Sequence, residues 1–143
     1  MREVSMSHEQ LTQNAMMRHL LQALEQRRDI GHYGRLVFAM VGRHFMSAQE
    51  LCNLLERNPG VTAEQAKALV KQVQGHDYNP PTRERILEWQ SQQDFPICPS
   101  DDPDACNVYK DLQFPDDVYE RISEYYEQKA AAEEAEHAGR NNR

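Results

Sequence analysis

Cys98 and Cys106 are the residues of this chain whose type and spacing most directly suggest chemistry. Seven residues separate them, including Pro99 and Pro103, and prolines within an Asp-rich turn could bring the two thiols together. A disulfide closing this nine-residue loop would stabilise the folded chain by about 2.5 kcal/mol in the chain-entropy model. A reversible disulfide is therefore one prediction. The alternative is a pair of half-buried thiols that pack the loop onto neighbouring helices.

A metal site is a further interpretation of the same cysteines. Structural zinc takes four ligands, usually with two to four residues between the members of a cysteine pair. The spacing here is wider, and no second pair exists. The suggested ligands are Cys98, Cys106 and His76, with zinc or another transition metal as the ion. His76 with Asp77, His32 or His44 could each complete the site, and the spacing selects none of them. The primary expectation is that no cofactor is bound, and Cys52, beside leucines on a helix, is expected in the core.

The string CPSDDPDACNVY, over residues 98–109, resembles a known redox hairpin. It is similar to the C-terminal cysteine hairpin of the small redox linker that ties glyceraldehyde-3-phosphate dehydrogenase to phosphoribulokinase. That hairpin has two cysteines, a proline in an acidic turn and a tyrosine shortly after the second cysteine. This chain has one residue fewer between its cysteines and continues well past the motif. The resemblance implies a thiol-responsive docking hairpin.

Other catalytic and ligand-binding motifs are missing or incomplete. Asp101, Asp102 and Asp104 lack the alternating oxygen ligands, glycine and distant Glu of a calcium-binding EF-hand, so turn and capping roles are expected. The chain has no glycine-rich phosphate loop, no H-E-x-x-H and no G-x-S-x-G. A cysteine paired with one of the six histidines is the catalytic arrangement left open. The sequence therefore favours a non-catalytic protein.

Polar residues bracket an apolar segment between residues 35 and 45. The string HYGR at residues 32–35 and the pair Arg43 and His44 could line a small-ligand or anion site between helices. The alternative is that they cap and solvate the ends of an apolar helix.

The net charge of −7 is concentrated in the last third of the chain. Residues 1–94 contain 11 Lys/Arg and 11 Asp/Glu, whereas residues 95–143 contain 5 and 12. Phosphate backbones are bound by concentrated Lys and Arg, which no segment here provides. Nucleic-acid binding is therefore unlikely, and the acidic third predicts a protein partner with a basic surface.

The longest apolar run, residues 36–41, is far shorter than the roughly 20 residues that span a bilayer. The first ten residues, MREVSMSHEQ, are polar and lack the apolar core of a signal peptide. We expect no membrane association and a cytoplasmic location.

Periodicity predicts helices throughout. Apolar residues draw one stripe over residues 7–27, with Ser7 and Gln10 as a capping box. Residues 29–34 break that helix, and the apolar segment after them predicts a buried central helix, because no second strand-like run could pair with it. Capping boxes at Ser47 and Thr62 predict a helical hairpin that ends near Gly75. Further helices are predicted from Thr82, anchored by Ile86, Leu87 and Trp89, and from Pro115.

The expected fold is all-α, a compact bundle of five to six helices. Residues 1–128 should form a single domain, in which a long, ordered loop with prolines and cysteines, residues 94–115, wraps the surface. Residues 129–143 are helix-prone with little to bury, and we expect a frayed, solvated, acidic tail.

The predicted function is that of a cytosolic, non-catalytic accessory or adaptor subunit. It would act through protein contacts made by the 94–119 loop and the acidic last helix. Tyrosine is favoured at interface hot spots. The candidate partner-binding residues are Tyr109, Phe114, Tyr119, Tyr125, Tyr126, Asp101, Asp102 and Asp104. The alternative is a metal-binding or thiol-redox regulatory module centred on Cys98 and Cys106.

Overall fold

The computed structural model describes residues 9–76, 79–100, 102 and 105–121 of the chain. Regular structure in these residues is helical throughout, with no strand among them, so the all-α prediction is confirmed. The chain divides into two compact units, Met1–Gln113 and Phe114–Arg143, and each is described by itself. The predicted domain boundary at residue 128 and the predicted tail lie outside the described residues.

The first helix of known bounds, α2, spans Ala15–Glu25. Residues 9–11 are also helical, but a turn over residues 12–14 separates them from α2, so the single continuous helix predicted here is wrong. The reason is Asn14, whose side chain accepts a hydrogen bond from the Met17 amide at 3.0 Å and starts a new helix. Ser7, of the predicted capping box, lies outside the described residues.

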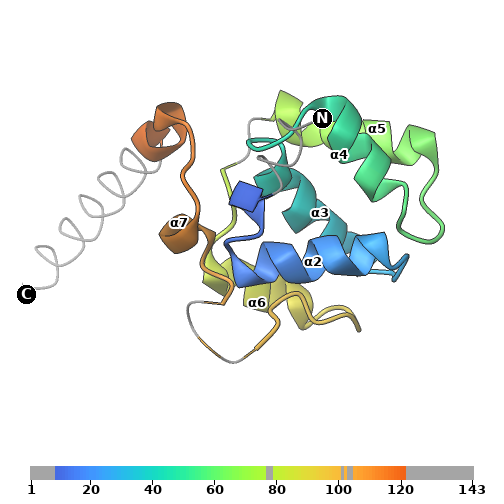
Figure 1. Cartoon of the computed structure of the whole chain (residues 1–143), viewed down its shortest axis with the longest axis horizontal. Helices are drawn as coiled ribbons and strands as arrows, with labels where there is room; N and C mark the ends of the chain where they lie inside the picture. Colours follow the sequence, from blue (N-terminus) through green and yellow to red (C-terminus); the bar gives the residue numbers. More distant parts are fainter. Residues whose placement is uncertain (1–8, 77–78, 101, 103–104, 122–143) are drawn as a thin grey trace, which may run out of the picture. The chain divides into compact units, whose positions relative to one another are not determined.

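The central helix, α3, spans Gly31–Gly42 and contacts α2, α4, α5 and α6 (Figure 1). Val37, Phe38, Ala39 and Val41 have no exposed surface, which confirms the predicted buried helix. It begins earlier than predicted, inside the segment expected to break it. Gly31, at φ +78°, takes the conformation that glycine favours, and its amide donates to the Asp29 carboxylate at 2.9 Å.

The helices α4 and α5 span Ala48–Leu55 and Ala63–Gly75 and pack against each other, as the predicted hairpin requires. The Ser47 hydroxyl accepts from the Glu50 amide at 3.2 Å, and Thr62 forms a full capping box with Gln65. Gly60, at φ +84°, turns the chain between the two helices. Gly75 is the last residue of α5 rather than the residue beyond it, and His76 is the C-cap.

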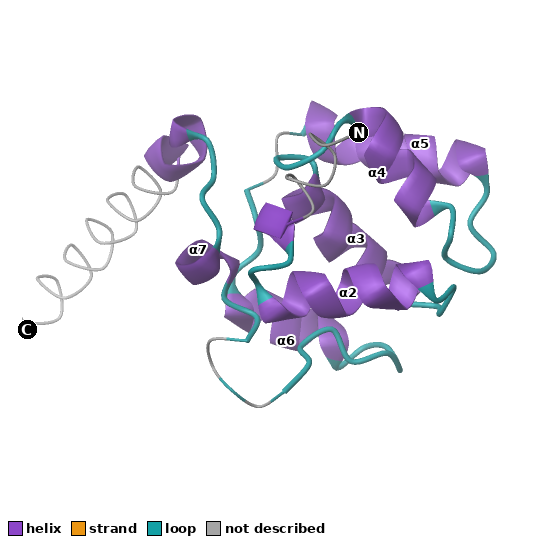
Figure 2. Cartoon of the chain, in the orientation of Figure 1, coloured by secondary structure: helices purple, strands orange, loops and turns teal. Residues whose placement is uncertain are grey.

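The helices α6 and α7 follow in the first unit (Figure 2). Thr82 caps α6, Arg83–Gln90, as predicted, but of its three expected anchors Ile86 is fully buried while Leu87 and Trp89 are half-buried. The helix α7, Val108–Asp111, interrupts the segment predicted to be loop. In the second unit, residues 116–121 are helical, in keeping with the helix predicted from Pro115. None of the described helices is long and apolar enough to cross a membrane.

Candidate functional site

Cys98 and Cys106 are joined by a disulfide bond, with their Cα atoms 5.4 Å apart. Both residues are buried, at 7% and 1% exposure. The pairing that their spacing made possible therefore exists, and the alternative of two free thiols does not hold for this structure. Cys52 is the free cysteine and is buried in α4, as expected.

The polypeptide beside the disulfide is fixed to the start of α2. The Met16 amide donates to the carbonyl of Ala105 at 3.0 Å. The side-chain amide of Asn14, which is fully buried, donates to the Asp111 carboxylate at 3.1 Å and to the carbonyl of Asn107 at 3.4 Å. The start of α2 therefore donates three hydrogen bonds to the residues on either side of Cys106: Ala105, Asn107 and Asp111. Such a buried, satisfied polar cluster defines one arrangement of the chain.

Residues 95–98 are held by α6, by α2 and by the loop that follows α2. The Cys98 amide donates to the Gln90 side chain of α6 at 2.8 Å. Phe95 stacks on His19 at 5.0 Å between ring centroids, and the Arg28 guanidinium lies 5.3 Å from the centre of the same ring. His19 Nε2 is also within hydrogen-bond distance, 2.8 Å, of the carbonyl of Pro96.

The opposite side of this segment faces solvent. Pro99, Ser100 and Asp102 are exposed, whereas Ile97, Ala105 and the two cysteines are buried. The Ala105 amide donates to the Asp102 carbonyl at 3.0 Å, which forms a turn just before Cys106. We call residues 95–108 the disulfide segment. Its described residues form an apolar inner side and a polar outer side.

The predicted partner-binding residues that the structure describes belong to both units, and each is described within its own unit. Tyr109 is half-buried, and its hydroxyl donates to the carbonyl of Pro80. In the second unit, Phe114 is buried, and the centre of its ring lies 6.4 Å from that of Tyr119. The backbone amide of Phe114 donates a hydrogen bond to the Tyr119 hydroxyl at 3.0 Å. Asp102 is exposed. The remaining candidates lie outside the described residues: Asp101, Asp104, Tyr125 and Tyr126.

The structure describes all three predicted metal ligands, Cys98, Cys106 and His76. With the disulfide formed, Cys98 and Cys106 have no thiolate to offer an ion. His76 is exposed at the end of α5. In the described ranges, no group of three or more His, Cys, Asp or Glu residues is arranged to hold a metal ion. A metal site at these cysteines would therefore require the reduced form and a rearranged segment.

A second feature is an open groove of about 450 Å³ between the first turns of α3, the turn at residues 58–61 and α5. His32 and Arg35, which the sequence suggested as ligand-binding residues, line it together with Asp29. Arg43 and His44, at the other end of α3, are not among its lining residues. The structure therefore separates the two ends of the helix that the sequence grouped together.

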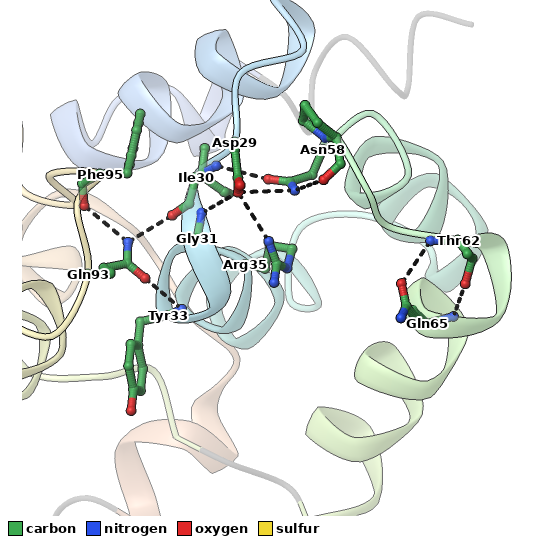
Figure 3. A network of polar contacts seen from close by, with 11 residues as sticks. Asp29, Ile30, Gly31, Tyr33, Arg35, Asn58, Thr62, Gln65, Gln93 and Phe95 are labelled. Carbon is green, nitrogen blue, oxygen red and sulfur yellow. Dashed lines mark hydrogen bonds and ion pairs between the residues drawn. The ribbon is translucent and has the colours of Figure 1, made fainter.

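The walls of this groove are tied together by a polar network (Figure 3). Asn58 is 1% exposed. Its side-chain oxygen Oδ1 accepts from the Ile30 amide at 2.9 Å, and its side-chain nitrogen Nδ2 donates to the Asp29 carboxylate at 3.3 Å. Asp29 also accepts from Arg35 at 3.4 Å. On the other side of α3, Gln93 accepts from the Tyr33 amide and donates to two carbonyls.

Sequence reasoning missed the side-chain amides that position both features. Asn14 precedes the apolar pair Met16 and Met17, where a capping residue is favoured, so its helix-starting role had a detectable signal. Asn58, followed by Pro59 and Gly60, carries a turn signal, but nothing local marks it as a partner of Asp29. Gln93 lies in a run of polar residues that gives no signal.

No family model, curated protein or solved structure matches this chain. The likeness of residues 98–109 to a redox hairpin is therefore confined to that motif.

Proposed function

We propose that the protein is a non-catalytic accessory or adaptor protein that acts through protein contacts. The contact surface would be the outer side of the disulfide segment together with the acidic residues that follow it. The observation that supports this proposal best is the two-sided character of residues 95–108. The inner side is buried and hydrogen-bonded to α2 and α6, while Pro99, Ser100 and Asp102 are presented to solvent.

A surface of this kind suits recognition because its two ends are held in place: the Cys98 amide bonds to α6, and the Ala105 carbonyl accepts from α2. When the ends of a docking segment are already fixed, less of the binding free energy is lost to conformational entropy. Exposed acids are also present beyond the segment, at Asp116, Asp117 and Glu120. Together with the net charge of −7, they support a partner with a basic surface and an association that weakens as salt is added.

The test is affinity purification of the full chain at low and at high salt, with the recovered proteins identified and the complex sized. The proposal predicts a defined partner at low salt that is lost at high salt. Recovery of the chain alone and monomeric at low salt would contradict it.

A second candidate, a thiol-redox regulatory role, is favoured by the Cys98–Cys106 disulfide itself. We place the protein in the cytoplasm, and disulfides in that compartment are usually transient and redox-sensing rather than structural. Reduction would release the segment that carries the proposed contact surface. Thiol counting before and after mild oxidant, with elemental analysis for metal, tests this candidate. A disulfide that resists physiological reductants, or a stoichiometric metal, would argue against it.

A further inference from the structure

The groove between α3 and α5 has the composition of a ligand site and is independent of the disulfide segment. Its volume, about 450 Å³, falls in the range of roughly 300–1,000 Å³ that is usual for small-molecule pockets. Val61 and Leu69, both half-buried, give it an apolar floor. Arg35, His32 and Gln72 give it a polar wall.

The groove is held in shape before any ligand arrives. Asn58 joins the turn at residues 58–61 to the start of α3 through Ile30 and Asp29. The capping box of Thr62 and Gln65, with hydrogen bonds of 3.0 and 3.1 Å, fixes the first turn of α5 (Figure 3). Pre-organised walls lower the cost of binding, because little ordering remains to be done.

Arg35 supplies the recognition chemistry. Its side chain is 22% exposed, and its one partner among the described residues is the Asp29 carboxylate, at a long 3.4 Å. A guanidinium has five donors in a planar fork that matches a carboxylate. Asp29 does not depend on this contact, because it also accepts from the Gly31 amide at 2.9 Å and from Asn58. Arg35 can therefore turn to a ligand without leaving a buried charge unpaired.

The nearby charges set the class of anion. Asp29 offsets the single cation of Arg35, and no lysine lines the groove. A phosphate dianion would meet Asp29 with only one arginine to balance it, whereas a monocarboxylate needs a single bidentate partner. We propose that this groove binds a small monocarboxylate, with its carboxylate on Arg35 and its hydrocarbon part on Val61 and Leu69.

The test is a titration of the isotope-labelled full chain with 4-methylpentanoate, followed by amide and arginine side-chain NMR signals. A ligand of this size is expected to bind with a Kd of about 1 mM. The proposal predicts saturable shifts at Arg35, Val61 and Leu69. The uncharged 4-methylpentanamide and inorganic phosphate should each bind at least about tenfold more weakly.

Two variants assign the binding to the groove. Arg35→Gln should weaken binding by about tenfold or more, while Arg57→Gln, which removes an exposed arginine that does not line the groove, should leave it unchanged. Leu69→Ala, at a half-buried position, should weaken it by about threefold to tenfold. Absence of saturable shifts in the wild-type chain, equal binding by Arg35→Gln, or phosphate binding as tight as that of the carboxylate would each overturn the proposal.

Discussion

The amide of Met16 donates a hydrogen bond to the carbonyl of Ala105, the residue immediately before the disulfide-bonded Cys106. The first amides of a helix have no partner within the helix and must be satisfied from outside it. At the start of α2 that role falls to the disulfide segment instead of to water. The state of the disulfide and the integrity of the first turn of α2 are therefore physically connected.

Removing the buried amide at the same helix end should be costly. Asn14→Ala loses the cap on Met17 and the donors to Asn107 and Asp111, so we expect the free energy of unfolding to fall by about 2 kcal/mol. Urea denaturation measures this. The control is Gln13→Ala, at an exposed neighbouring position, which should change stability by less than about 0.5 kcal/mol. Equal effects from the two variants would show that Asn14 is not an anchor.

Removing the disulfide should destabilise the first turn of α2 as well as the loop. In Cys98→Ala/Cys106→Ala, the free energy of unfolding should fall by about 2.5 kcal/mol. The Met16 amide should also exchange faster with solvent, because its acceptor is no longer held in place. Hydrogen exchange followed by NMR checks this, with the Val70 amide in the middle of α5 as an internal reference. A reductant should reproduce the effect in the wild-type chain and add nothing in the double variant. An unchanged Met16 exchange rate, relative to Val70, would break the proposed link.

The helices could largely be predicted from the sequence because each carries a local signal. Ser47, Thr62 and Thr82 cap their helices as capping patterns predict, and the apolar run in α3 is buried. The break before α2 had a local signal that was overlooked, because Asn14 caps Met17 three residues on. The start of α3 had less to predict it from, because it is also held by the side chains of Asn58 and Gln93, which are remote in sequence. The groove has the same origin, because it exists only when the turn at residues 58–61 meets α3.

Gly31 and Gly60 both have a left-handed backbone conformation. Comparing alanine variants at these two positions separates the cost of backbone strain from the cost of side-chain crowding. Gly31→Ala and Gly60→Ala both force alanine to a positive φ, at a cost of about 1 kcal/mol each. A Cβ on Gly31 would also lie 2.5 Å from the side-chain oxygen Oε1 of Gln93, whereas one on Gly60 has nothing within 4 Å. Gly31→Ala should therefore cost about 1–2 kcal/mol more than Gly60→Ala, as Gln93 loses hydrogen bonds.

Thermal and urea denaturation of both variants provide the comparison. Gly75→Ala is the matched control, because Gly75 lies in the last turn of α5 with open space around it, and it should stabilise the protein by up to about 1 kcal/mol. Equal losses for Gly31→Ala and Gly60→Ala would mean that Gln93 does not hold the start of α3.

Cys52 should be far less reactive than an ordinary thiol. Burial, with a smaller contribution from the negative charge of Glu56, raises the pKa of this thiol above its usual value of 9.0. The thiolate is the reactive form, so alkylation at neutral pH should be slow until the protein is unfolded. Because the folded pKa is the higher one, the stability linked to this group is present below pH 9.0 and is lost as pH rises through the folded value. Rapid labelling of the folded protein would contradict this.

A matched pair of charge reversals tests the proposal that the outer side of the disulfide segment is a contact surface. Asp102 lies on that surface, while Glu25 is an exposed acid on α2 that lies outside it. Each variant, Asp102→Lys and Glu25→Lys, changes the net charge equally, so the affinity for the partner recovered at low salt isolates the effect of position. The account predicts that Asp102→Lys weakens this affinity by about tenfold or more while Glu25→Lys has little effect. Equal affinities for the two variants would contradict it.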